Sequence, residues 1–425
     1  MAENKAGMMS VAIVGLGYVG LPLAMLFEKH GFHVVGVDID QHKIDLLNQH
    51  KSYLSDLTDE QIAILMKHHR FQPTTDFSRI RQTSACILCV PTPLRHERYP
   101  DLSHLQSAVM SMIPHLAPQQ LIVLESSTFP GTTEEVIKPL LEKEGFQIGK
   151  HIFLGYSPER IDPGNTTYLL EDVPKVISGV TKACVERVKR LYGQVFRHLV
   201  PVSKTRHAEM TKLLENSQRL VNISFMNEIM MLCHKMDINI WEVIEAAKTK
   251  PYGFTAYYPG PGAGGHCIPV DPMYLNWKAE EYDFTPQFIH LAKKINDLIP
   301  HYIVERMLDI LPEKKARETR ILLIGLTYKK DVNDVRESPA ITILNELIQL
   351  GLQVDYHDPF VPQMIVSEQT FSSVNLSPQT LKTYDGIVIL TDHSHIDYSL
   401  IVKHAPLVFD TRHVLDGQSD NVHHL

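Results

Sequence analysis

The sequence has no long hydrophobic run and no block of basic residues. None of its uninterrupted apolar runs approaches the ~18 residues that a membrane-spanning helix needs, so we expect no membrane insertion. Its 41 Lys and Arg residues are outnumbered by 49 Asp and Glu residues, which gives a formal net charge of −8. An acidic chain without basic clusters is not expected to have nucleic acid as its main partner.

Cysteine is scarce, with five residues in a chain of 425. An odd number of scattered cysteines does not suit a disulfide framework and favours a reducing compartment, so we expect a cytoplasmic protein. Cys86 and Cys89 have the CxxC spacing of a zinc ligand pair, but they lie in an apolar, strand-like run without a second pair. We interpret them as core residues. His393 and His395 lack a neighbouring carboxylate or thiol cluster, and we expect no metal.

The apolar run at residues 11–27, preceded by Lys5, superficially resembles a signal peptide. It lacks a small-residue cleavage site, and it is interrupted by Gly15, Gly17, Gly20 and Pro22. We therefore interpret it as part of a folded domain.

The hydrophobic pattern predicts an α/β fold with two Rossmann-like, doubly wound parallel-sheet domains joined by a long central helix. Residues 205–248 contain no proline or glycine and show helical spacing of apolar residues, which indicates one long or two consecutive helices, and 286–311 and 340–350 are further helices. We expect an N-terminal Rossmann domain (1–200), a central helical domain with a cysteine loop (201–311) and a C-terminal Rossmann-like domain (312–425), which begins with a charged linker at 312–319. Short buried strands are expected at residues 11–14, 33–37, 85–90, 121–125, 151–154, 320–326, 353–356, 386–390 and 406–409.

A dinucleotide-binding fingerprint follows the first expected strand. The sequence GLGYVG at residues 15–20 lies between a strand and a helix, where its glycines allow a tight turn and close approach of a pyrophosphate. Asp38 ends the second strand, 23 residues after Gly15, and is placed to accept from a ribose hydroxyl. Asp38 and Asp40 without an adjacent arginine favour NAD over NADP. The alternative is a Rossmann turn that binds nothing.

Three other strands end in polar residues. Thr92, Thr128 and Glu159 follow the strands at 85–90, 121–125 and 151–154. Ligands of an open parallel sheet lie beyond the carboxyl ends of its strands, so these side chains are candidates to line one crevice. Ordinary turn chemistry is the alternative for each of them taken singly.

The sequence GGHCIPVDP at residues 264–272 presents Cys267 on a loop stiffened by Pro269 and Pro272. Such a loop suits a nucleophile that must reach a substrate, but these residues alone are equally consistent with a proline-rich loop and an incidental cysteine. Lys212 and Asn216 are four residues apart and project from one face of the expected helix, with a solvated surface pair as the alternative. Cations suited to phosphate gather at strand ends of the last third: Lys329, Lys330, Arg336 and Arg412.

Taken together and in this order, these motifs resemble the nucleotide-sugar 6-dehydrogenase family, which includes UDP-glucose, GDP-mannose and UDP-N-acetylhexosamine dehydrogenases. The resemblance covers nearly the full length and is most similar to the bacterial UDP-N-acetylglucosamine 6-dehydrogenase branch. Segments that carry the branch resemblance are residues 100–102, 162–165 and 258–262. His266 stands where UDP-glucose enzymes commonly carry a serine, which weakens that assignment.

The resemblance implies a mechanism. The C6 alcohol of the sugar loses a hydride to NAD, Cys267 forms a thiohemiacetal with the aldehyde, and a second hydride loss leaves a thioester that water hydrolyses. Lys212 and Asn216 would stabilise oxyanion charge, Thr128 and Asp271 would position water and take protons, and Glu159 would be the base in hydrolysis. Lys329 would bind phosphate, and Arg336 would reach NAD.

The family pattern also yields two sets of binding residues. Implied contacts of NAD are Gly15, Gly17, Tyr18, Val19, Gly20, Asp38, Lys43, Val90, Thr92, Thr128 and Arg336. Implied contacts of the UDP-sugar are Glu159, Arg160, Lys212, Asn216, Tyr257, Tyr258, Gly260, Gly264, Tyr328, Lys329 and Arg412.

Several alternatives stay open. The sugar is UDP-N-acetylglucosamine by resemblance, with the N-acetylmannosamine, N-acetylgalactosamine and glucose analogues as alternatives, because a single sequence does not show the loop geometry that separates them. A cysteine hydrolase would need a histidine bonded to Cys267, and the adjacent His266 is badly placed for that. A non-catalytic NAD-binding scaffold is the remaining alternative. The family also implies a homodimer or higher homo-oligomer.

Overall fold

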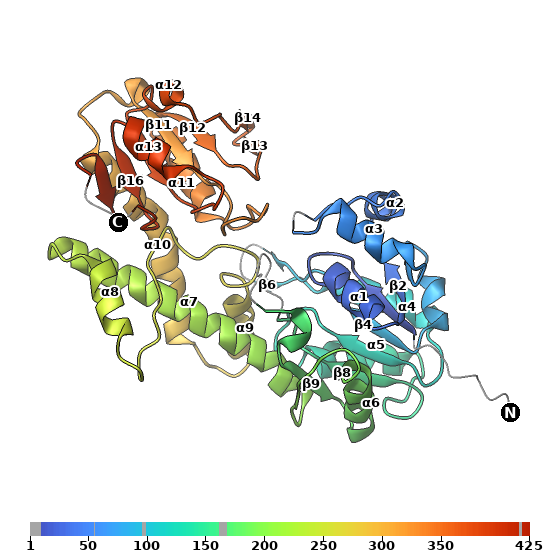
Figure 1. Cartoon of the computed structure of the whole chain (residues 1–425). Coiled ribbons are helices and arrows are strands. Elements are labelled where there is room, and N and C mark those ends of the chain that lie inside the picture. The colour runs from blue at the N-terminus through green and yellow to red at the C-terminus, as the bar shows by residue number, and fades with distance from the viewer. Residues whose placement is uncertain (1–9, 55, 96–98, 161–167, 416–418) are drawn as a thin grey trace. The chain divides into compact units, whose positions relative to one another are not determined.

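A computed structural model describes residues 10–54, 56–95, 99–160, 168–415 and 419–425. The segment 162–165, part of the branch resemblance, lies outside the described residues. The chain forms two compact units, here called unit 1 (residues 1–215 and 273–284) and unit 2 (residues 216–272 and 285–425). Each unit contains one main β-sheet with helices packed against it (Figure 1).

The sheet of unit 1 has eight strands in the order β10-β9-β8-β7-β4-β1-β2-β3. All neighbours are parallel except β8 and β9, which are antiparallel. Val37, Val14, Leu88, Leu124 and Tyr156 lie side by side in the last row of five strands. The residues that follow them therefore emerge at one edge of the sheet. The bounds are β1 Ser10–Val14, β2 His33–Val37, β3 Phe71–Thr74, β4 Ala85–Leu88, β7 Leu121–Leu124, β8 Phe153–Tyr156, β9 Lys175–Gly179 and β10 Leu199–Pro201.

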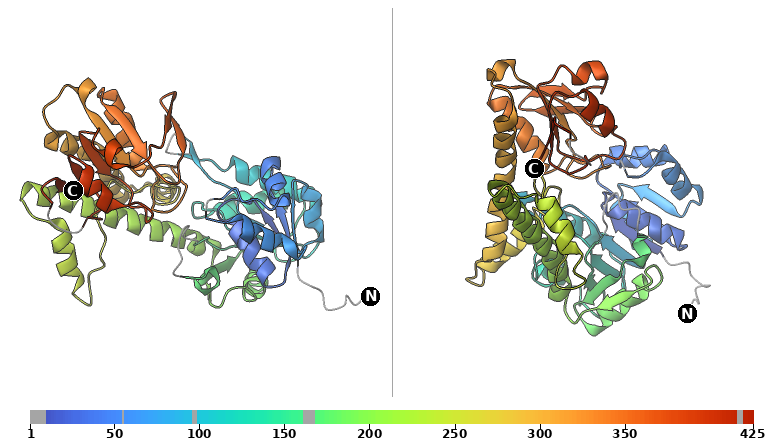
Figure 2. Two further views of the ribbon diagram at one scale, coloured as in Figure 1. Left: turned by 45° about the horizontal axis from the view of Figure 1, so that its top comes forward. Right: turned by 60° about the vertical axis from the view of Figure 1, so that its left-hand side comes forward.

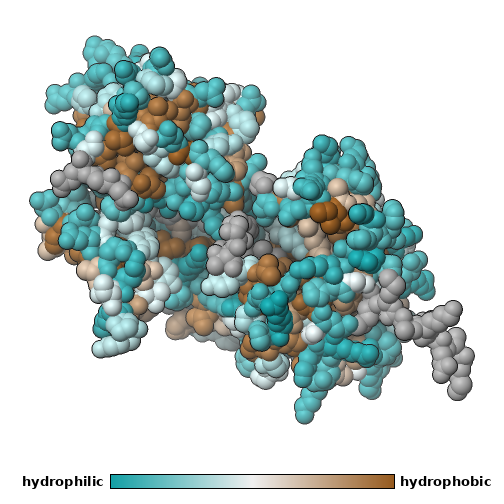
Figure 3. All heavy atoms as spheres, viewed as in Figure 1, coloured by the Kyte–Doolittle hydropathy of each residue, from teal (hydrophilic) through white to brown (hydrophobic). Residues whose placement is uncertain are grey.

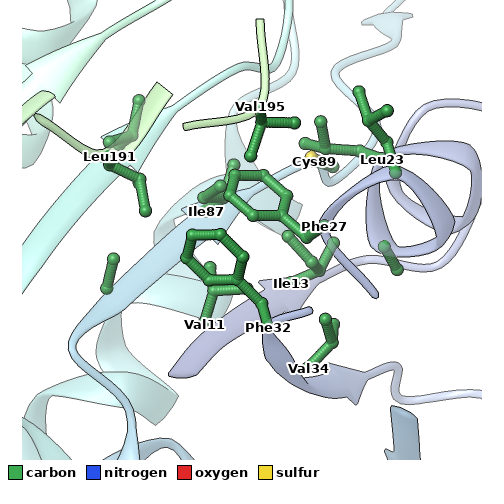
Figure 4. Packing of buried hydrophobic residues seen from close by; sticks show 14 of the residues in the cluster. Val11, Ile13, Leu23, Phe27, Phe32, Val34, Ile87, Cys89, Leu191 and Val195 are labelled. Atoms are coloured by element: carbon green, nitrogen blue, oxygen red, sulfur yellow. The ribbon is translucent and has the colours of Figure 1, made fainter. Parts of the chain in front are cut away.

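The two faces of this sheet bury different side chains, because successive residues of a strand point to opposite faces. Val11 and Ile13 pack under α1 (Gly20–Lys29) and α6 (Lys182–Tyr192), in the cluster that Figure 4 shows with Phe27 and Leu191. The alternate residues of β1 pack on the other face, toward α4 (Ser103–Met112) and α5 (Lys138–Lys143). Helices thus cover both faces, as in a doubly wound fold.

Shorter elements complete unit 1. The hairpin β5 (Leu94–Arg95) and β6 (Tyr99–Pro100) follows β4. The remaining helices of this part are α2 Gln41–Asn48, α3 Asp59–Lys67, η1 Phe77–Gln82, η2 Ile113–His115, η3 Thr132–Ile137 and η4 Leu170–Asp172.

The main sheet of unit 2 has the order β12-β11-β15-β16-β17, with parallel neighbours throughout. Ile321 and Leu323 of β11 pack on one face with α11, and Leu322 and Ile324 pack on the other with α13. The bounds are β11 Arg320–Ile324, β12 Gln353–His357, β15 Gly386–Ile389, β16 Val408–Asp410, β17 Val422–His424, the hairpin β13 Gln363–Val366 and β14 Gln369–Ser372, η5 Ala316–Glu318, α11 Pro339–Gln349, α12 Pro378–Leu381 and α13 Tyr398–His404.

The central helices confirm the prediction made from the proline-free and glycine-free segment. It forms two consecutive helices, α7 (Thr205–Lys235, 31 residues) and α8 (Ile240–Lys248). In unit 2, α7 packs on α10 (Gln287–Ile310), where Ser224 Oγ donates to the Ala292 carbonyl at 2.8 Å (Figure 2). The short helix α9 (Asp271–Glu280) follows the cysteine loop.

The predicted fold class is confirmed: an α/β structure with two sheets of mainly parallel strands and a long central helix. Among the described residues, four strands of the two main sheets and the four strands of the two hairpins were not anticipated, and the strand expected at 151–154 begins two residues later, at Phe153. The four unanticipated strands of the main sheets are β3, β9, β10 and β17. The three-domain division stays a prediction.

The surface carries mainly hydrophilic side chains on the face drawn in Figure 3, with smaller hydrophobic patches between them. In the part of the chain that the structure describes, no helix is both long and apolar enough to cross a membrane.

Candidate active site

The glycine turn after β1 has the geometry that a dinucleotide needs. Gly15 adopts φ +92°, and a Cβ on it would lie 2.7 Å from the Cys89 carbonyl oxygen. A Cβ on Gly20, the first residue of α1, would lie 1.8 Å from the Gly15 carbonyl oxygen. A Cβ on Gly17, in contrast, would meet nothing within 4 Å. The first and third glycines are therefore required by packing, whereas the second leaves space at the N-terminus of α1, where a pyrophosphate is favoured.

This contrast gives a prediction that separates cofactor binding from folding. Gly17→Val should weaken NAD binding by about tenfold or more, ~1.4 kcal/mol, because its side chain fills the space that a pyrophosphate would occupy. Its melting temperature should stay within about 2 °C of wild type, because a surface change with no clash costs little. Titration with NAD and thermal unfolding measure the two quantities.

Gly20→Ala supplies the comparison, since its Cβ has no room, and it should lower the melting temperature strongly. Unchanged NAD affinity in Gly17→Val would contradict the assignment of the turn to the dinucleotide.

Asp38 closes the other side of the turn. Its carboxylate is buried and accepts from the Leu16 and Asp40 amides at 2.8 and 3.0 Å and from Lys43 Nζ at 3.1 Å. A carboxylate offers about four acceptor positions, so one remains for a ribose hydroxyl. Lys43 lies over the ring of Tyr53, whose hydroxyl donates to the Leu16 carbonyl. Burial, with the charges of Asp38 and Asp40, raises the pKa of Tyr53, which stays a donor.

Tyr53 was not anticipated from the sequence, because no motif marks it. Its role follows only from its contacts with the turn.

The ends of β4 and β7 are tied together next to the turn. Ser126 Oγ donates to the Val90 carbonyl at 2.7 Å, and Thr92 Oγ1 donates to the Ser127 carbonyl at 2.6 Å. Thr128 is fully buried, and its Oγ1 has no hydrogen-bond partner among the described residues. A buried hydroxyl of this kind is suited to a ligand or water.

Glu209 on α7 holds the turn that follows Thr128. Its buried carboxylate accepts from the Gly131 amide at 2.6 Å and from the amide and hydroxyl of Thr133 at 2.9 and 2.6 Å. Burial raises the pKa of Glu209. Lys212 lies three residues further along α7, so this contact fixes Thr128 relative to the helix that carries Lys212. Glu209 was not anticipated from the sequence, where it looks like a surface residue of the helix.

Glu159 and Lys212 form a buried ion pair in unit 1. Lys212 Nζ lies 3.0 Å from Glu159 Oε2, and the side chains are only 8% and 7% exposed. The neighbouring Arg160 pairs with Glu215 of α7 at 2.7 Å in a more exposed position. The pairing offsets the cost of burying each charge, since an unpaired buried charge would be costly.

In unit 2, Asn216 and Asp271 form a hydrogen-bonded pair. Asn216 Nδ2 donates to Asp271 Oδ2 at 2.6 Å, and Asp271 is fully buried. The Asp271 amide donates to the Cys267 carbonyl at 2.8 Å. Cys267 is half-buried, whereas the other four cysteines are buried. Three of the predicted catalytic residues are thus brought together, although 55 residues separate Asn216 from Asp271 in sequence.

The glycines of the cysteine loop pack against the segment that follows β11. A Cβ on Gly264 would lie 2.6 Å from the Glu337 carbonyl oxygen. Gly265 adopts φ +84°, and a Cβ on it would lie 2.7 Å from the ring of Tyr328. The Gly265 amide donates to the Arg336 carbonyl at 3.1 Å. The structure therefore joins the Cys267 loop to the predicted nucleotide-binding segment.

The other predicted substrate contacts have partners within unit 2. Arg412 is half-buried, donates to the Leu390 carbonyl at 2.7 Å, and lies 3.1 Å from a Cβ placed on Gly260. Tyr257 donates to Gln218 at 3.2 Å, and Tyr258 donates to Glu245 at 2.8 Å. Lys329 is half-buried.

Arg336 is half exposed and forms a forked ion pair with Asp334, at 2.6 to 3.2 Å. A contact with NAD would have to compete with this pair, and that role stays a prediction.

A hydrogen-bond network in the second sheet repeats the arrangement at Asp38. Asp358 follows β12 and accepts from the Leu326 amide at 2.7 Å, and the buried His393 lies 3.2 Å from the same carboxylate oxygen. His393 Nδ1 accepts from the Asp331 amide at 3.0 Å, which fixes the loop that contains Lys329. Across the described ranges, no group of three or more His, Cys, Asp or Glu residues could hold a metal ion.

Comparison with known proteins agrees with this geometry. The chain matches three models of the UDP-glucose/GDP-mannose dehydrogenase family: the NAD binding domain over residues 9–196, the central domain over 206–298 and the UDP binding domain over 322–417. It is 33% identical to a UDP-N-acetyl-D-glucosamine 6-dehydrogenase of Pseudomonas aeruginosa, over 97% of this chain and 99% of the relative. It is 34% identical to an NDP-N-acetyl-D-galactosaminuronic acid dehydrogenase of Ralstonia solanacearum, over 90% of both chains.

A similar solved structure is the UDP-N-acetyl-mannosamine dehydrogenase Cap5O from Staphylococcus aureus, with a TM-score of 0.83 and 33% identity over 98% of this chain and 97% of that one. The relatives match this chain over its length, and the fingerprint, the cysteine loop and the second sheet fall in the matched NAD-binding, central and UDP-binding domains, respectively. The chain therefore belongs to the UDP-glucose/GDP-mannose dehydrogenase family and is an NAD-dependent UDP-sugar dehydrogenase, an oxidoreductase that acts on a CH–OH group.

Proposed function

We propose that this enzyme oxidises the C6 hydroxyl of a UDP-N-acetylhexosamine, with UDP-N-acetylglucosamine as the preferred substrate, to the uronic acid. The observation that carries the proposal is Cys267, a half-buried thiol on a loop that packs against the Tyr328–Arg336 region of the UDP-binding domain. A thiol at this place allows an aldehyde to be held covalently and oxidised again.

The reaction removes four electrons from one carbon. NAD, held by the glycine turn and Asp38, would supply the oxidant for both hydride losses from C6, one molecule for each loss. After the first loss the alcohol is an aldehyde, and the Cys267 thiolate adds to it to give a thiohemiacetal, whose oxygen takes up a proton. The second loss gives a thioester and releases that proton. Water then adds, the C–S bond breaks, and carboxylate and free thiol are regenerated.

Lys212 and Asn216 are assigned to the developing oxyanions. The ammonium of Lys212 is held by Glu159, and the amide of Asn216 is oriented by Asp271. A preorganised cation and an amide donor stabilise negative oxygen most effectively where water is excluded. The burial of Lys212 and Asp271 supports this assignment.

Proton transfer is assigned to Thr128, Asp271 and Glu159. The buried hydroxyl of Thr128 and the carboxylate of Asp271 are suited to hold a water and to take the proton of the C6 alcohol. Glu159 is assigned as the general base that activates water against the thioester. Its carboxylate is held by Lys212 Nζ at 3.0 Å, which supports a fixed position for a base.

The nucleotide is assigned to unit 2. Lys329 and Arg412 supply positive charge for the diphosphate. The other proposed contacts of the nucleotide-sugar in this unit are Tyr257, Tyr258, Gly260, Gly264 and Tyr328. Arg160 of unit 1 is a further proposed substrate contact. His393 holds the loop that contains Lys329 through the Asp331 amide, which supports a fixed position for this lysine.

The choice of sugar rests on the resemblance of the loop motifs to the UDP-N-acetylglucosamine branch and on His266 before the cysteine. The named relatives act on N-acetylglucosamine, N-acetylgalactosaminuronic acid and N-acetylmannosamine derivatives at similar identity, so the mannosamine, galactosamine and glucose analogues are the alternative substrates.

We also propose that the enzyme is a cytoplasmic homodimer or higher homo-oligomer. Five free cysteines support a reducing compartment. Phe225 and Leu232 of α7 are 53% and 51% exposed, which supports self-association through this helix.

A substrate panel tests the proposed function. We expect NADH formation with UDP-N-acetylglucosamine at the highest kcat/KM of the four UDP-sugars, with about two NADH for each sugar consumed, as two hydride losses require. The purified chain is assayed at 340 nm, and the product is identified by mass spectrometry. One NADH per sugar would contradict the four-electron reaction, and a higher kcat/KM with another epimer would correct the substrate.

A further inference from the structure

A buried charged cluster lies beside Glu159 and takes no part in the mechanism above. Lys175 Nζ lies 2.7 Å from Glu125 Oε2, and the two side chains are only 7% and 1% exposed. The hydroxyl of Tyr192 donates to the other oxygen of Glu125. Burial and the charge of Glu125 raise the pKa of Tyr192 well above its usual range, so it remains a donor. Lys175 also lies 5.3 Å from the ring centroid of Tyr192 and 5.2 Å from that of Phe196.

Stability alone is a poor explanation for this cluster. Taking two charges out of water costs about as much as their attraction returns, and an apolar pair of similar volume often serves a core equally well. A buried pair can instead fix one arrangement of the chain among several. The contacts of Lys175 show which arrangement that is.

Residues 174–176, at the start of β9, hold the segment that carries Glu159. Ser157 Oγ donates to the Val176 carbonyl at 2.7 Å, and Arg160 Nη1 donates to the Pro174 carbonyl at 2.9 Å. Lys175 Nζ donates to the Pro158 carbonyl at 3.4 Å, at the long end of hydrogen bonding. Three successive residues of one segment thus hold the residues on both sides of Glu159.

Three members of the two ion pairs, Glu125, Lys175 and Glu159, also border one small cavity. It has a volume of about 10 Å³, close to the minimum for one water molecule, and Glu125, Glu159, Arg160 and Lys175 are among its lining residues. Both carboxylates line this cavity, and the structure pairs Lys175 with Glu125 and Lys212 with Glu159. Because Lys175 pairs with Glu125, the ion pair between Glu159 and Lys212 is undisturbed.

We propose that Lys175 is a positioning residue for Glu159: by pairing with Glu125 and holding the Pro158 carbonyl, it keeps the Glu159 carboxylate on Lys212 and ready to activate water. This inference rests on the proposed function of Glu159 in thioester hydrolysis. It assigns Lys175 an effect on the last step of the reaction and little effect on the two oxidations.

Lys175→Met tests the inference because it keeps the length of the side chain and removes its charge and donor. We expect the two oxidations to keep the wild-type rate, which gives a rapid burst of about two NADH per active site, followed by turnover slowed relative to wild type on the order of 10- to 100-fold, the scale of an ångström-sized misplacement of a catalytic group. Intact-protein mass spectrometry during turnover should show the acyl-enzyme on Cys267. General structural damage would instead slow the burst and the turnover together and overturn the proposal.

A double variant covers the case in which Lys175→Met fails to fold. Glu125→Gln with Lys175→Met removes both charges, so no unpaired carboxylate is buried, but the bond to Pro158 is still lost. The acyl-enzyme should accumulate in it as well. Lys278→Met is the matched control, because Lys278 is a 5% exposed lysine of unit 1 that pairs with Glu135 and Glu281, and it should show no acyl-enzyme.

Two outcomes separate the inference from its premise. If wild type forms no NADH with any of the four UDP-sugars, the proposed function itself fails. If wild type is active and both the single and the double variant turn over without accumulating acyl-enzyme, the positioning role of Lys175 is wrong, and the proposed function is unaffected.

Discussion

Replacing Cys267 with alanine is expected to abolish uronic acid formation and to leave NAD binding intact. Without the thiol, the aldehyde cannot be converted to a thiohemiacetal, and the second hydride loss has no covalent intermediate to act on. The glycine turn and Asp38 belong to unit 1, whereas Cys267 belongs to unit 2, so the substitution leaves the dinucleotide contacts in place.

The expected loss in kcat for uronic acid is on the order of 10⁴-fold or more, the scale observed when an enzyme loses its covalent nucleophile. NADH formation and product mass measure the reaction, and titration measures NAD affinity, which should stay within about twofold of wild type because no contact of the turn is altered.

Cys233→Ala is the matched control. Cys233 is a buried core residue of unit 2, 8% exposed, and its loss should lower stability modestly and leave kcat near wild type. Uronic acid formation by Cys267→Ala at a rate comparable with wild type would refute the covalent mechanism.

The reactivity of the native cysteines provides an independent check on the same assignment. Cys267 is half-buried, and the other four cysteines are buried. Burial and the charge of Glu125 raise the pKa of the Cys89 thiol well above its usual range, and burial raises that of Cys86 to about 12. These thiols are therefore inert toward alkylation, and a thiol reagent should modify Cys267 first.

The fold could be predicted where the pattern of apolar residues is strong. The apolar runs of β1, β4, β7 and β11 and the proline-free segment of α7 identify their elements directly. β3 and β9 were not predicted because each contains a residue that is unusual in a strand. Pro73 lies inside β3, and the buried Lys175 opens β9, where only its pairing with Glu125 makes burial possible.

The sequence predicts which types of residue form the site, but it predicts only some of the contacts between them. The position of Asp38 followed from its distance to Gly15 along a known turn-and-strand arrangement. The contacts of Glu159 with Lys212 and of Glu209 with Gly131 join residues that are 53 and 78 positions apart, and they depend on how α7 packs against the strand ends. No local pattern contains that information, so Glu209, Glu125 and Lys175 became visible only in three dimensions.

Glu159→Gln is expected to trap the acyl-enzyme. The amide keeps the shape of the side chain and can still accept from Lys212 Nζ, which lies 3.0 Å from Oε2 in the wild-type chain, so the oxyanion contacts and both oxidations should be preserved. The amide cannot take a proton from water, and hydrolysis should slow by about 10²- to 10⁴-fold, the usual contribution of a general base.

The measurement is a burst of about two NADH per active site, as two hydride losses require, with an acyl adduct on Cys267 in the intact-protein mass spectrum. Glu215→Gln is the control, because Glu215 is also a glutamate in an ion pair with a neighbouring cation, Arg160, and it should form no lasting adduct. A burst of only one NADH would place Glu159 in the oxidations rather than in hydrolysis. Turnover at the wild-type rate would leave the Glu159–Lys212 pair with a purely structural role, because an isosteric amide can maintain that contact but cannot act as a base.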